Sequence, residues 1–424
     1  MTFARMLYTL AMMALLPLAL LRLAWRARRQ PAYLAHIGER LGRNRNPAPA
    51  QPLIWVHAVS VGETRAAQPL IEALLGKYPD HRVLLTHMTP TGRETGEALF
   101  GDRVTRCYLP YDYPGAVERF LDHFRPRLGV LMETELWCNL IHACHQRRIP
   151  LYLANARLSE KSLRGYQRFS SIMRESLPKL SGIAAQSESD ARRLHALGAT
   201  EVTVTGNVKF DVTPPAAQIE LGRAWRAGFV ARPVLLAAST RDGEEALLLD
   251  ALNTLTPADT LLVIVPRHPQ RFDEVAALIK ERNLPYQRRS SGLPVEVQSR
   301  ILLGDSMGEM FAYYTACDVA FIGGSLAPLG GQNLIDACAL GKPVIVGPSS
   351  YNFAEAADGA IAAGAALRVN AAAEVMHEAS RLIADAAAAK RMGAAGIAFT
   401  QAHRGATQRA LNLLVMNSEP RRAP

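Results

Sequence analysis

A glutamate that follows the first predicted strand has the residue type and position for acid–base chemistry. Ser60 and Glu63 lie three residues apart in the turn after the apolar run 53–58. This spacing is typical of a capping box, in which the serine caps a helix N-terminus and the glutamate reaches back to it. Alternatively, Glu63 is a carboxylate at a sheet edge, kept ionised at neutral pH by the helix N-terminus and able to accept a proton from an alcohol. Both interpretations remain open at this point.

Further charged residues follow later strands of the same half. Glu133 and Glu135 come directly after the third predicted strand, where the helix dipole favours acids in a first turn whatever their role. Arg157 follows the fourth predicted strand, and Lys209 lies shortly after the sixth. Each cation is either an ordinary surface residue or a ligand for a phosphate or carboxylate group.

The second half of the chain places cations in similar positions. Arg241 follows its first predicted strand, and Arg267 and His268 follow its second between two prolines. Such a pair forms either a rigid turn or a ligand contact at the strand end. A turn rich in small residues follows the next strand and contains Met307, Gly308 and Glu309.

A glycine-rich run at 323–333 opens a predicted helix that carries Asp336. It lacks the GK[ST] sequence of a P-loop and does not indicate a magnesium-bound triphosphate. Its backbone N–H groups and the helix N-terminus could still bind one phosphate, with Asp336 accepting hydrogen bonds from a ribose. A tight turn without a ligand is the alternative. A nicotinamide dehydrogenase is disfavoured, because the turn after 53–58 lacks the GxGxxG pattern.

No pattern of metal ligands accompanies these residues. The spacings of His57, His87, His142 and His145 match no ligand set, and the five cysteines include no CxxC pair. We therefore expect neither a bound metal, nor another cofactor, nor a disulfide framework.

Short apolar runs that alternate with helical stretches must position these groups. With 424 residues, the chain is long enough for two or three domains. Its two series of apolar runs predict two doubly wound α/β halves, whose parallel sheets bind ligands beyond the carboxyl ends of the strands. We expect an N-terminal domain at 31–215, a second domain at 216–385 and a helical segment at 386–424 that packs back on the first. The predicted strands are 53–58, 82–87, 127–132, 150–154, 182–186, 201–205, 233–238, 260–265, 299–303, 318–322 and 343–346.

An apolar segment precedes both halves and predicts a membrane anchor at 1–30. Residues 7–25 are apolar except for one Thr, one Arg and Pro17, which is barely the length that a bilayer needs. The first fifty residues hold eight Arg and one Glu, so that +7 of the net charge of +10 belongs to them. A basic cluster beside an apolar segment indicates anionic lipid and not nucleic acid. The positive-inside rule predicts that the rest of the chain is cytoplasmic.

Ordered sequence blocks along the chain resemble those of the bacterial 3-deoxy-D-manno-octulosonic acid (Kdo) transferase family. The resemblance runs from the apolar segment to about residue 415. The blocks that carry it are HAVSVGE (57–63), ETELW (133–137), NARLSEKS (155–162), QSESDARR (186–193), TGNVKFD (205–211), PRHPQRF (266–272), GDSMGEM (304–310) and GGSLAPLGGQNLIDA (323–337).

The resemblance implies a GT-B glycosyltransferase, with two Rossmann-like domains facing a central crevice. Its reaction would be the inverting, metal-independent transfer of Kdo from CMP-Kdo to the lipid A precursor, lipid IVA, in lipopolysaccharide synthesis. The enzyme would act at the cytoplasmic face of the bacterial inner membrane. One alternative is another membrane-associated GT-B glycosyltransferase with a UDP-sugar donor, and another is a membrane-tethered nucleotide-binding protein without catalysis.

The same resemblance assigns roles to individual residues. The general base would be Glu63. On their positions after strands, and not on the resemblance, we expect Glu133 to support Glu63 and Lys209 and Arg241 to contact phosphate or carboxylate groups. The CMP contacts would come from Arg267, His268, Met307, Gly308, Glu309, Asn333, Leu334, Ile335 and Asp336.

The chain departs from the usual family pattern at two of the quoted positions. Cys138 stands where the family usually has Pro, and Asp336 stands where it usually has Glu, which retracts the ribose-binding carboxylate by one methylene. In the basic cluster, Arg40, Arg43 and Arg45 would extend the surface for anionic lipid and the phosphates of the acceptor. Because none of this chemistry lies before Ser60, we expect a chain without residues 1–30 to fold and remain active.

Overall fold

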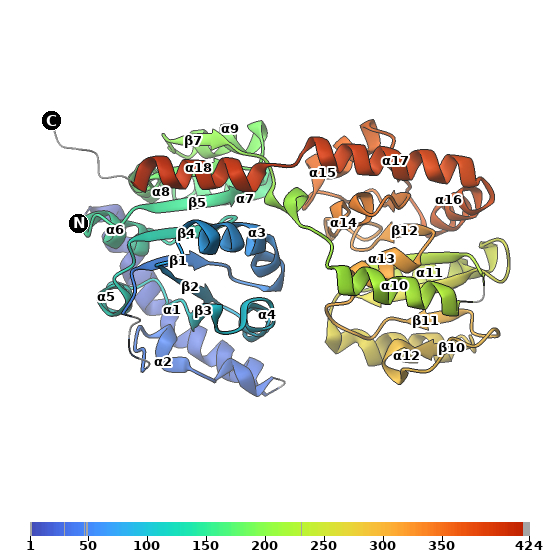
Figure 1. The fold of residues 1–424 in the computed structure, drawn as a ribbon. Helices are drawn as coiled ribbons and strands as arrows, with labels where there is room; N and C mark the ends of the chain where they lie inside the picture. Colours follow the sequence, from blue (N-terminus) through green and yellow to red (C-terminus); the bar gives the residue numbers. More distant parts are fainter. Residues whose placement is uncertain (1, 29, 46, 48–49, 230, 419–424) are drawn as a thin grey trace. The chain divides into compact units, whose positions relative to one another are not determined.

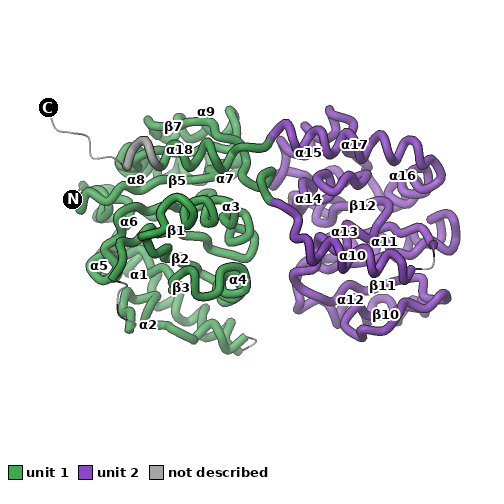
Figure 2. Tube along the Cα trace, viewed as in Figure 1, with its two compact units in different colours: residues 1–212, 404–424 green, residues 213–403 purple. Residues whose placement is uncertain are grey.

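The computed structural model describes residues 2–28, 30–45, 47, 50–229 and 231–418. The chain divides into two compact units (Figures 1 and 2). Unit 1 comprises residues 1–212 and 404–424, and unit 2 comprises residues 213–403. The chain therefore leaves unit 1 after residue 212 and returns to it for its last helix.

Unit 1 contains a seven-stranded parallel sheet in the order β3-β2-β1-β4-β5-β6-β7. The winding order reverses between the neighbouring strands β1 and β4, and ligands of open parallel sheets bind beyond the carboxyl ends at such a point. The strands are β1 (Leu53–His57), β2 (Arg82–His87), β3 (Val104–Tyr108), β4 (Leu128–Met132), β5 (Leu151–Ala156), β6 (Gly182–Ala185) and β7 (Val202–Val204).

Two hydrophobic cores cover the two faces of this sheet. One core joins the sheet to α3, α4 and α18, and the other joins it to α5, α6, α8 and α9. The helices of unit 1 are α1 (Phe3–Ala27), α2 (Ile37–Arg40), α3 (Val61–Lys77), α4 (Pro90–Phe100), α5 (Pro114–Phe124), α6 (Cys138–Gln146), α7 (Glu160–Gln167), α8 (Ser170–Ser176), α9 (Glu188–Ala196) and α18 (Ala406–Ser418).

Unit 2 repeats the design with a seven-stranded parallel sheet in the order β10-β11-β9-β8-β12-β13-β14. Its order reverses between β8 and β12. The strands are β8 (Val234–Thr240), β9 (Leu261–Pro266), β10 (Tyr286–Arg288), β11 (Ile301–Leu303), β12 (Val319–Ile322), β13 (Val344–Val346) and β14 (Ala366–Arg368). The helices are α10 (Ala216–Gly228), α11 (Glu244–Ala251), α12 (Phe272–Glu281), α13 (Met310–Ala316), α14 (Ile335–Ala339), α15 (Ala354–Ala362), α16 (Ala372–Ala384) and α17 (Ala386–Ala402).

The predicted fold class is confirmed, because both units are parallel α/β sheets of the Rossmann type. The sequence patterns missed the strands β3, β10 and β14. All three are edge strands, which pair on one side only and need no continuous apolar run. The strand β3, for example, places Thr105 and Arg106 between Val104 and Cys107.

The C-terminal segment does not pack as a single piece on unit 1, which corrects the expectation for 386–424. The helix α17 belongs to unit 2 and packs against α14. Glycines make this close approach possible, because a Cβ on Gly393 would overlap the carbonyl oxygen of Gly341. Only α18 returns to unit 1, where the carboxylate of Asp211 accepts hydrogen bonds from the backbone N–H groups of Gly405 and Thr407.

The N-terminal helix α1 is docked on unit 1 by one polar side. The hydroxyl of Tyr8 donates to Oδ2 of the buried Asp112 at 2.7 Å, and Asp112 also accepts from the first backbone N–H groups of α6. The hydroxyl of Thr9 lies 3.0 Å from Oδ1 of Asn139, and Nε of Arg5 lies 3.4 Å from the same oxygen. The N-terminal half of α1 is therefore part of the folded unit.

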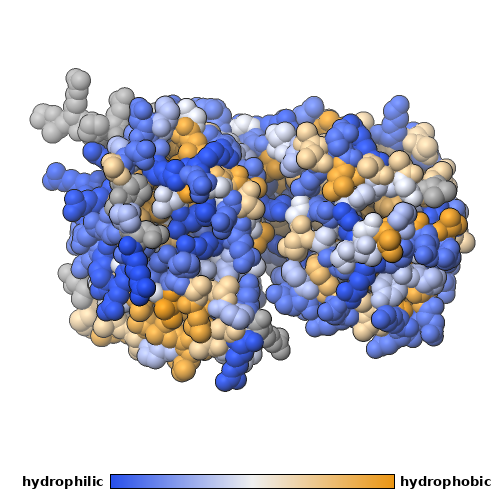
Figure 3. All heavy atoms as spheres, turned by 60° about the horizontal axis from the view of Figure 1, so that its bottom comes forward, coloured by the Kyte–Doolittle hydropathy of each residue, from blue (hydrophilic) through white to orange (hydrophobic). Residues whose placement is uncertain are grey.

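The opposite side of α1 is apolar and exposed. Among the described residues α1 alone is long and apolar enough to cross a membrane. Figure 3 shows hydrophobic side chains gathered on the face of unit 1 where α1 and α2 lie. The exposed apolar residues of α1 are Phe3, Met6, Leu7, Leu10, Met13, Leu15, Leu18, Leu21 and Trp25.

The expectation that Arg40 contributes to a lipid-binding basic cluster is wrong. Arg40 is only 1% exposed. Its guanidinium stacks on the ring of Tyr108 at 3.8 Å and donates to the carbonyl of Met88. Arg43 and Arg45 are exposed, whereas Arg29 lies outside the described residues.

A chain without residues 1–30 would lose the hydrogen bonds that α1 makes to the rest of unit 1, so we now expect it to be less stable than the full-length chain. A single substitution tests the contribution of these bonds. We predict that Tyr8→Phe, which removes only the hydroxyl that donates to a buried carboxylate, lowers the free energy of unfolding by about 1.5–3 kcal/mol. Urea denaturation in detergent measures this change. Leu7→Ala on the exposed side of α1 is the control and should change stability by less than about 0.5 kcal/mol. Equal effects of the two substitutions would contradict the docking of α1.

Candidate functional site

Glu63 lies in the first turn of α3, at the carboxyl end of β1. Its Oε2 accepts the backbone N–H of Val59 at 2.9 Å, and its Oε1 accepts the hydroxyl of Ser60 at 3.1 Å. The predicted capping box is therefore not formed, because Glu63 accepts the backbone N–H of Val59 and not that of the N-cap residue Ser60. Ser60 is the N-cap residue, but its side chain accepts no hydrogen bond from the helix and donates to Glu63 instead.

Burial raises the pKa of Glu63 to about 8, and the charges of Glu133 and Glu135 add to this rise. The hydrogen bonds from Val59 and Ser60 favour the ionised form but do not offset the loss of solvent. Glu63 is therefore mostly protonated at neutral pH. This corrects the expectation that the helix N-terminus keeps it ionised.

Glu133 follows β4, the neighbour of β1, and has a positive φ of 59°. Its Oε1 lies 2.9 Å from Nζ of Lys209, and both side chains are mostly buried. Burial acts to raise the pKa of Glu133, but the charges of Lys209 and Arg157 outweigh it and hold the pKa below its usual value. Glu133 is thus the ionised acid beside the protonated Glu63.

Glu135 is a third acid in the same region. The indole N–H of Trp137 donates to its Oε2 at 2.8 Å, and burial raises its pKa to about 7. The same oxygen lies 4.0 Å from Nε2 of His57, the last residue of β1. This contact is not an ion pair at neutral pH, because complete burial lowers the pKa of His57 to about 3. His57 instead bonds to Thr86 through Nδ1.

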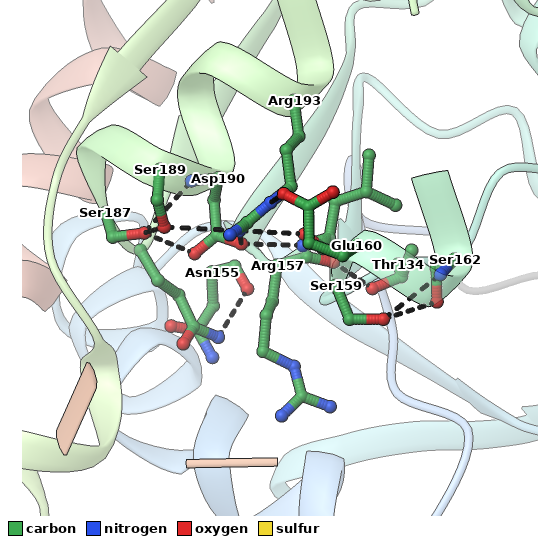
Figure 4. A network of polar contacts seen from close by, with 12 residues as sticks. Thr134, Asn155, Arg157, Ser159, Glu160, Ser162, Ser187, Ser189, Asp190 and Arg193 are labelled. Atoms are coloured by element: carbon green, nitrogen blue, oxygen red, sulfur yellow. Dashed lines mark hydrogen bonds and ion pairs between the residues drawn. The ribbon is translucent and has the colours of Figure 1, made fainter. Parts of the chain in front are cut away.

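Figure 4 shows how two separate sequence blocks fix the loop that carries Arg157. The carboxylate of Asp190 accepts the backbone N–H of Leu158 at 2.8 Å, and Arg193 reaches the carbonyl of Leu158 and the carboxylate of Glu160. The hydroxyl of Thr134 donates to the carbonyl of Arg157. The guanidinium of Arg157 points away from this network, so the network positions the backbone and leaves the charge outside it.

The cations of unit 2 lie at or beside its own point of strand reversal, which is between β8 and β12. Arg241 follows β8, while Arg267 and His268 follow the adjacent β9. Nε of Arg267 donates to Oε1 of Gln332 in the glycine-rich loop at 3.1 Å. Burial lowers the pKa of His268, and the nearby Arg241 and Arg267 lower it further, so that His268 is neutral at neutral pH.

The glycine-rich loop at 323–333 uses several of its N–H groups internally, so that these groups are not open to a phosphate. The carboxylate of Glu244 accepts from Gly324 at 2.5 Å and from Leu326 at 2.9 Å. Gly330 donates to the hydroxyl of Ser349, and Gly331 donates to the carbonyl of Gly324. The following helix, α14, has only five residues, so its dipole offers little to an anion.

The other predicted donor contacts divide into accessible and buried groups. Met307 is half exposed, Gly308 has φ 83° and accepts from Gln218 through its carbonyl, and Glu309 pairs with Arg289 at 3.1 Å. Leu334 and Ile335 are buried, so that only their backbone could meet a ligand. Asn333 accepts the N–H of Ile335 with its side chain, and Asp336 is partly buried on α14.

Several residues that shape the two sites were not singled out from the sequence. Gln332, Glu244 and Asp211 act through partners that are 65 to 196 positions away in the chain. In the sequence, the only indication of their importance was that they lie in one of the ordered blocks or in a turn that follows a strand. Cys138 is the first residue of α6, a helix position that suits Pro as well as Cys, so this departure from the family pattern is local.

No group of three metal-ligating side chains occurs among the described residues. All five cysteines are buried and free.

Comparison with known proteins gives concordant matches. The family model for 3-Deoxy-D-manno-octulosonic-acid transferase (kdotransferase) matches residues 35–212. The chain is 48% identical to the 3-deoxy-D-manno-octulosonic acid transferase of Bordetella pertussis, over 96% of this chain and 98% of that protein. It is 36% identical to the transferase of the same name from Haemophilus influenzae, over 97% and 98% of the two chains.

Solved structures with low sequence identity share the fold. The Anabaena protein HepE in complex with UDP matches with a TM-score of 0.60 at 15% identity, over 87% of this chain and all of that one. The UDP-GlcNAc 2-epimerase of Neisseria meningitidis matches with a TM-score of 0.59 at 16% identity, over 86% of this chain and all of that one. These likenesses concern the two-unit architecture alone.

The charges of Glu133 and Glu135 contribute to the raised pKa of Glu63, and substitution of either acid tests this contribution. We expect Glu133→Gln to lower the pKa of Glu63 below about 8, because the substitution removes a negative charge that disfavours the ionised form. Glu135→Gln should lower it less, and Ser60→Ala should raise it by removing a donor to the carboxylate. Titration of selectively ¹³C-labelled glutamate by NMR measures all three shifts. An unchanged pKa in Glu133→Gln would contradict the coupling of the two acids.

Proposed function

The chain belongs to the Kdo transferase family and is a glycosyltransferase, and from this premise we propose that it transfers Kdo from CMP-Kdo to the lipid A precursor lipid IVA. We propose further that the transfer inverts the anomeric configuration and needs no metal ion. Support for the substrates comes from the nearly full-length similarity to proteins named Kdo transferases. Support for the mechanism comes from the partly buried Glu63, whose pKa is raised, and from the cations of unit 2.

Glu63 is the general base of this mechanism. It removes the proton from an acceptor hydroxyl as that oxygen forms a bond to the anomeric carbon of Kdo, while the bond from this carbon to the phosphate oxygen of CMP breaks. A single displacement of this kind inverts the anomeric centre. The raised pKa of about 8 makes the ionised carboxylate a stronger base than an ordinary glutamate. The rate constant kcat/KM should therefore rise with pH as Glu63 loses its proton.

Because of its leaving group, this reaction needs cations that stabilise the departing CMP more than it needs a general acid. CMP departs as a phosphate monoester, which carries its own charge and gains most from fixed positive groups. Arg241 and Arg267 follow adjacent strands of unit 2 and can supply this charge. Lys209 is less suited to this role than we expected from the sequence, because Glu133 already pairs with it.

We propose that the helix α1 attaches the enzyme to the cytoplasmic surface of the inner membrane. A spanning helix would carry its attached polar partners into the hydrocarbon, at a high cost in desolvation. Since Thr9 and Tyr8 bond to unit 1 on one side while the other side is apolar, we propose that α1 lies in the plane of the interface. The exposed Arg22, Arg26 and Arg28 would then meet anionic lipid.

A membrane wash tests this orientation. We expect a wash with about 1 M salt, which shortens the Debye length to about 3 Å, to release part of the full-length protein from inner-membrane vesicles. Leu18→Asp on the exposed side of α1 should release more without lowering the stability of the folded protein in detergent. Complete retention of both proteins through the wash would favour a spanning helix.

Mass spectrometry of lipid IVA incubated with CMP-Kdo and the purified full-length protein tests the activity. We expect the lipid to gain Kdo, and we expect the gain to persist in EDTA. Free CMP should compete with the donor better than UDP does. Loss of transfer in EDTA with recovery on addition of one divalent ion would overturn the metal-free mechanism, and a preference for UDP would favour a UDP-sugar donor.

Glu63→Gln serves as the matched variant in this assay. Its side chain keeps the size and one hydrogen-bond acceptor of the glutamate but cannot take a proton. We expect normal folding and CMP binding with a loss of transfer of about two to four orders of magnitude. Turnover near that of the wild type would assign Glu63 a capping role only.

A further inference from the structure

Glu244 is a completely buried carboxylate at the beginning of α11, and its exposed fraction is 0%. Its Oε2 accepts the backbone N–H of Arg241 at 2.9 Å and that of Gly324 at 2.5 Å. Its Oε1 accepts the N–H of Leu326 at 2.9 Å and faces that of Ala327 at 3.5 Å. One side chain therefore joins the turn after β8 to the glycine-rich loop after β12.

This contact lies where the strand order of unit 2 reverses. The strands β8 and β12 are neighbours, and the loop runs directly over the end of β8. A Cβ on Gly323 would lie 2.5 Å from Cα of Thr240, so that only glycine permits this approach. The carboxylate of Glu244 thus fills a cluster of N–H groups that a glycine-rich loop could otherwise offer to a phosphate.

The rest of the loop is held at other points. The hydroxyl of Ser325 accepts the N–H of Gly347 at 2.8 Å. The backbone carbonyl of Ser325 accepts the N–H of Ser349 at 2.9 Å. Gln332 at the far end of the loop accepts from Arg267. Glu244 therefore fixes the beginning of the loop, and Arg267 connects its end to the predicted donor contacts.

We propose that Glu244 is a positioning residue for the donor site, acting as an internal anion that sets the conformation of residues 324–327. This inference rests on the proposed function, because it takes the glycine-rich loop to be part of the CMP-Kdo site. Glu244 does not touch the donor. With these N–H groups occupied, the charged groups of the donor are bound by side chains such as Arg241 and Arg267.

The chain supplies a matched control in the next residue. Glu245 is also 0% exposed and belongs to the same helix turn. Its Oε1 accepts from the hydroxyl of Thr240 at 2.7 Å and pairs with Arg271 at 2.6 Å, but no hydrogen bond from the described residues of the glycine-rich loop reaches it. Substitution of either acid removes a buried charge, whereas only Glu244 acts on the loop.

The experiment compares Glu244→Gln with Glu245→Gln in full-length protein. Glu244→Gln replaces one carboxylate oxygen by an NH2 group, which cannot accept the hydrogen bonds that the backbone N–H groups of the loop donate. We expect the resulting change of loop conformation to raise the KM for CMP-Kdo by about ten- to a hundredfold. The kcat at saturating donor should stay within about threefold of the wild type. Glu245→Gln should leave the KM for donor within about twofold, although both variants lower the Tm. Hydrogen exchange of the Gly324 and Leu326 amides should accelerate in Glu244→Gln only.

Equal changes of the donor KM in the two variants, or a fall in kcat alone, would overturn the proposal and leave Glu244 a general stability role. If Glu244→Gln does not fold, Glu244→Asp replaces it, since the shorter side chain keeps the charge but cannot reach both segments. Transfer by the wild type is measured first. Its absence would reject the proposed function, while calorimetric titration with CMP would still compare the two variants at the loop.

Discussion

The reversal of strand order at the centre of each sheet is the constraint on which both candidate sites depend. In unit 1 it makes the carboxyl ends of β1 and β4 neighbours, which brings Glu63 and Glu133 together although seventy positions separate them in the chain. Removal from water then gives the two acids different protonation states. Glu133 is ionised because Lys209 and Arg157 compensate its charge, and Glu63 keeps its proton because no cation does so to the same extent.

Carboxylates that are buried or partly buried and accept backbone N–H groups fix several loops of the chain. Asp112 holds the start of α6, Asp190 holds the loop that carries Arg157, Asp211 holds the start of α18, and Glu244 holds the glycine-rich loop. An ionised oxygen in a low-dielectric interior bonds strongly to several N–H donors and is costly to leave without them. Each such acid therefore specifies one conformation of its loop, which is what a site made of loops at strand ends requires.

The N-terminal helix α1 is attached to this framework by its polar side. Its polar side shares Asp112 with the first turn of α6, and α6 begins directly after the segment that carries Glu133 and Glu135. The helix thus combines an exposed apolar side with a side that is packed into unit 1. Arg40, just beyond it, is buried against Tyr108 and attaches the following segment near the ends of β2 and β3.

The sequence by itself determined the two parallel α/β units, the family and the strand ends where chemistry-bearing residues lie, because apolar runs and turn residues are local signals. It did not reveal the edge strands β3, β10 and β14, whose one-sided pairing needs no apolar run. Only the tertiary structure decided that Glu63 is protonated, that Arg40 is buried and that the N–H groups of Gly324 and Leu326 belong to Glu244. Burial and charge depend on neighbours brought from distant positions in the chain, and residue spacing carries no record of them.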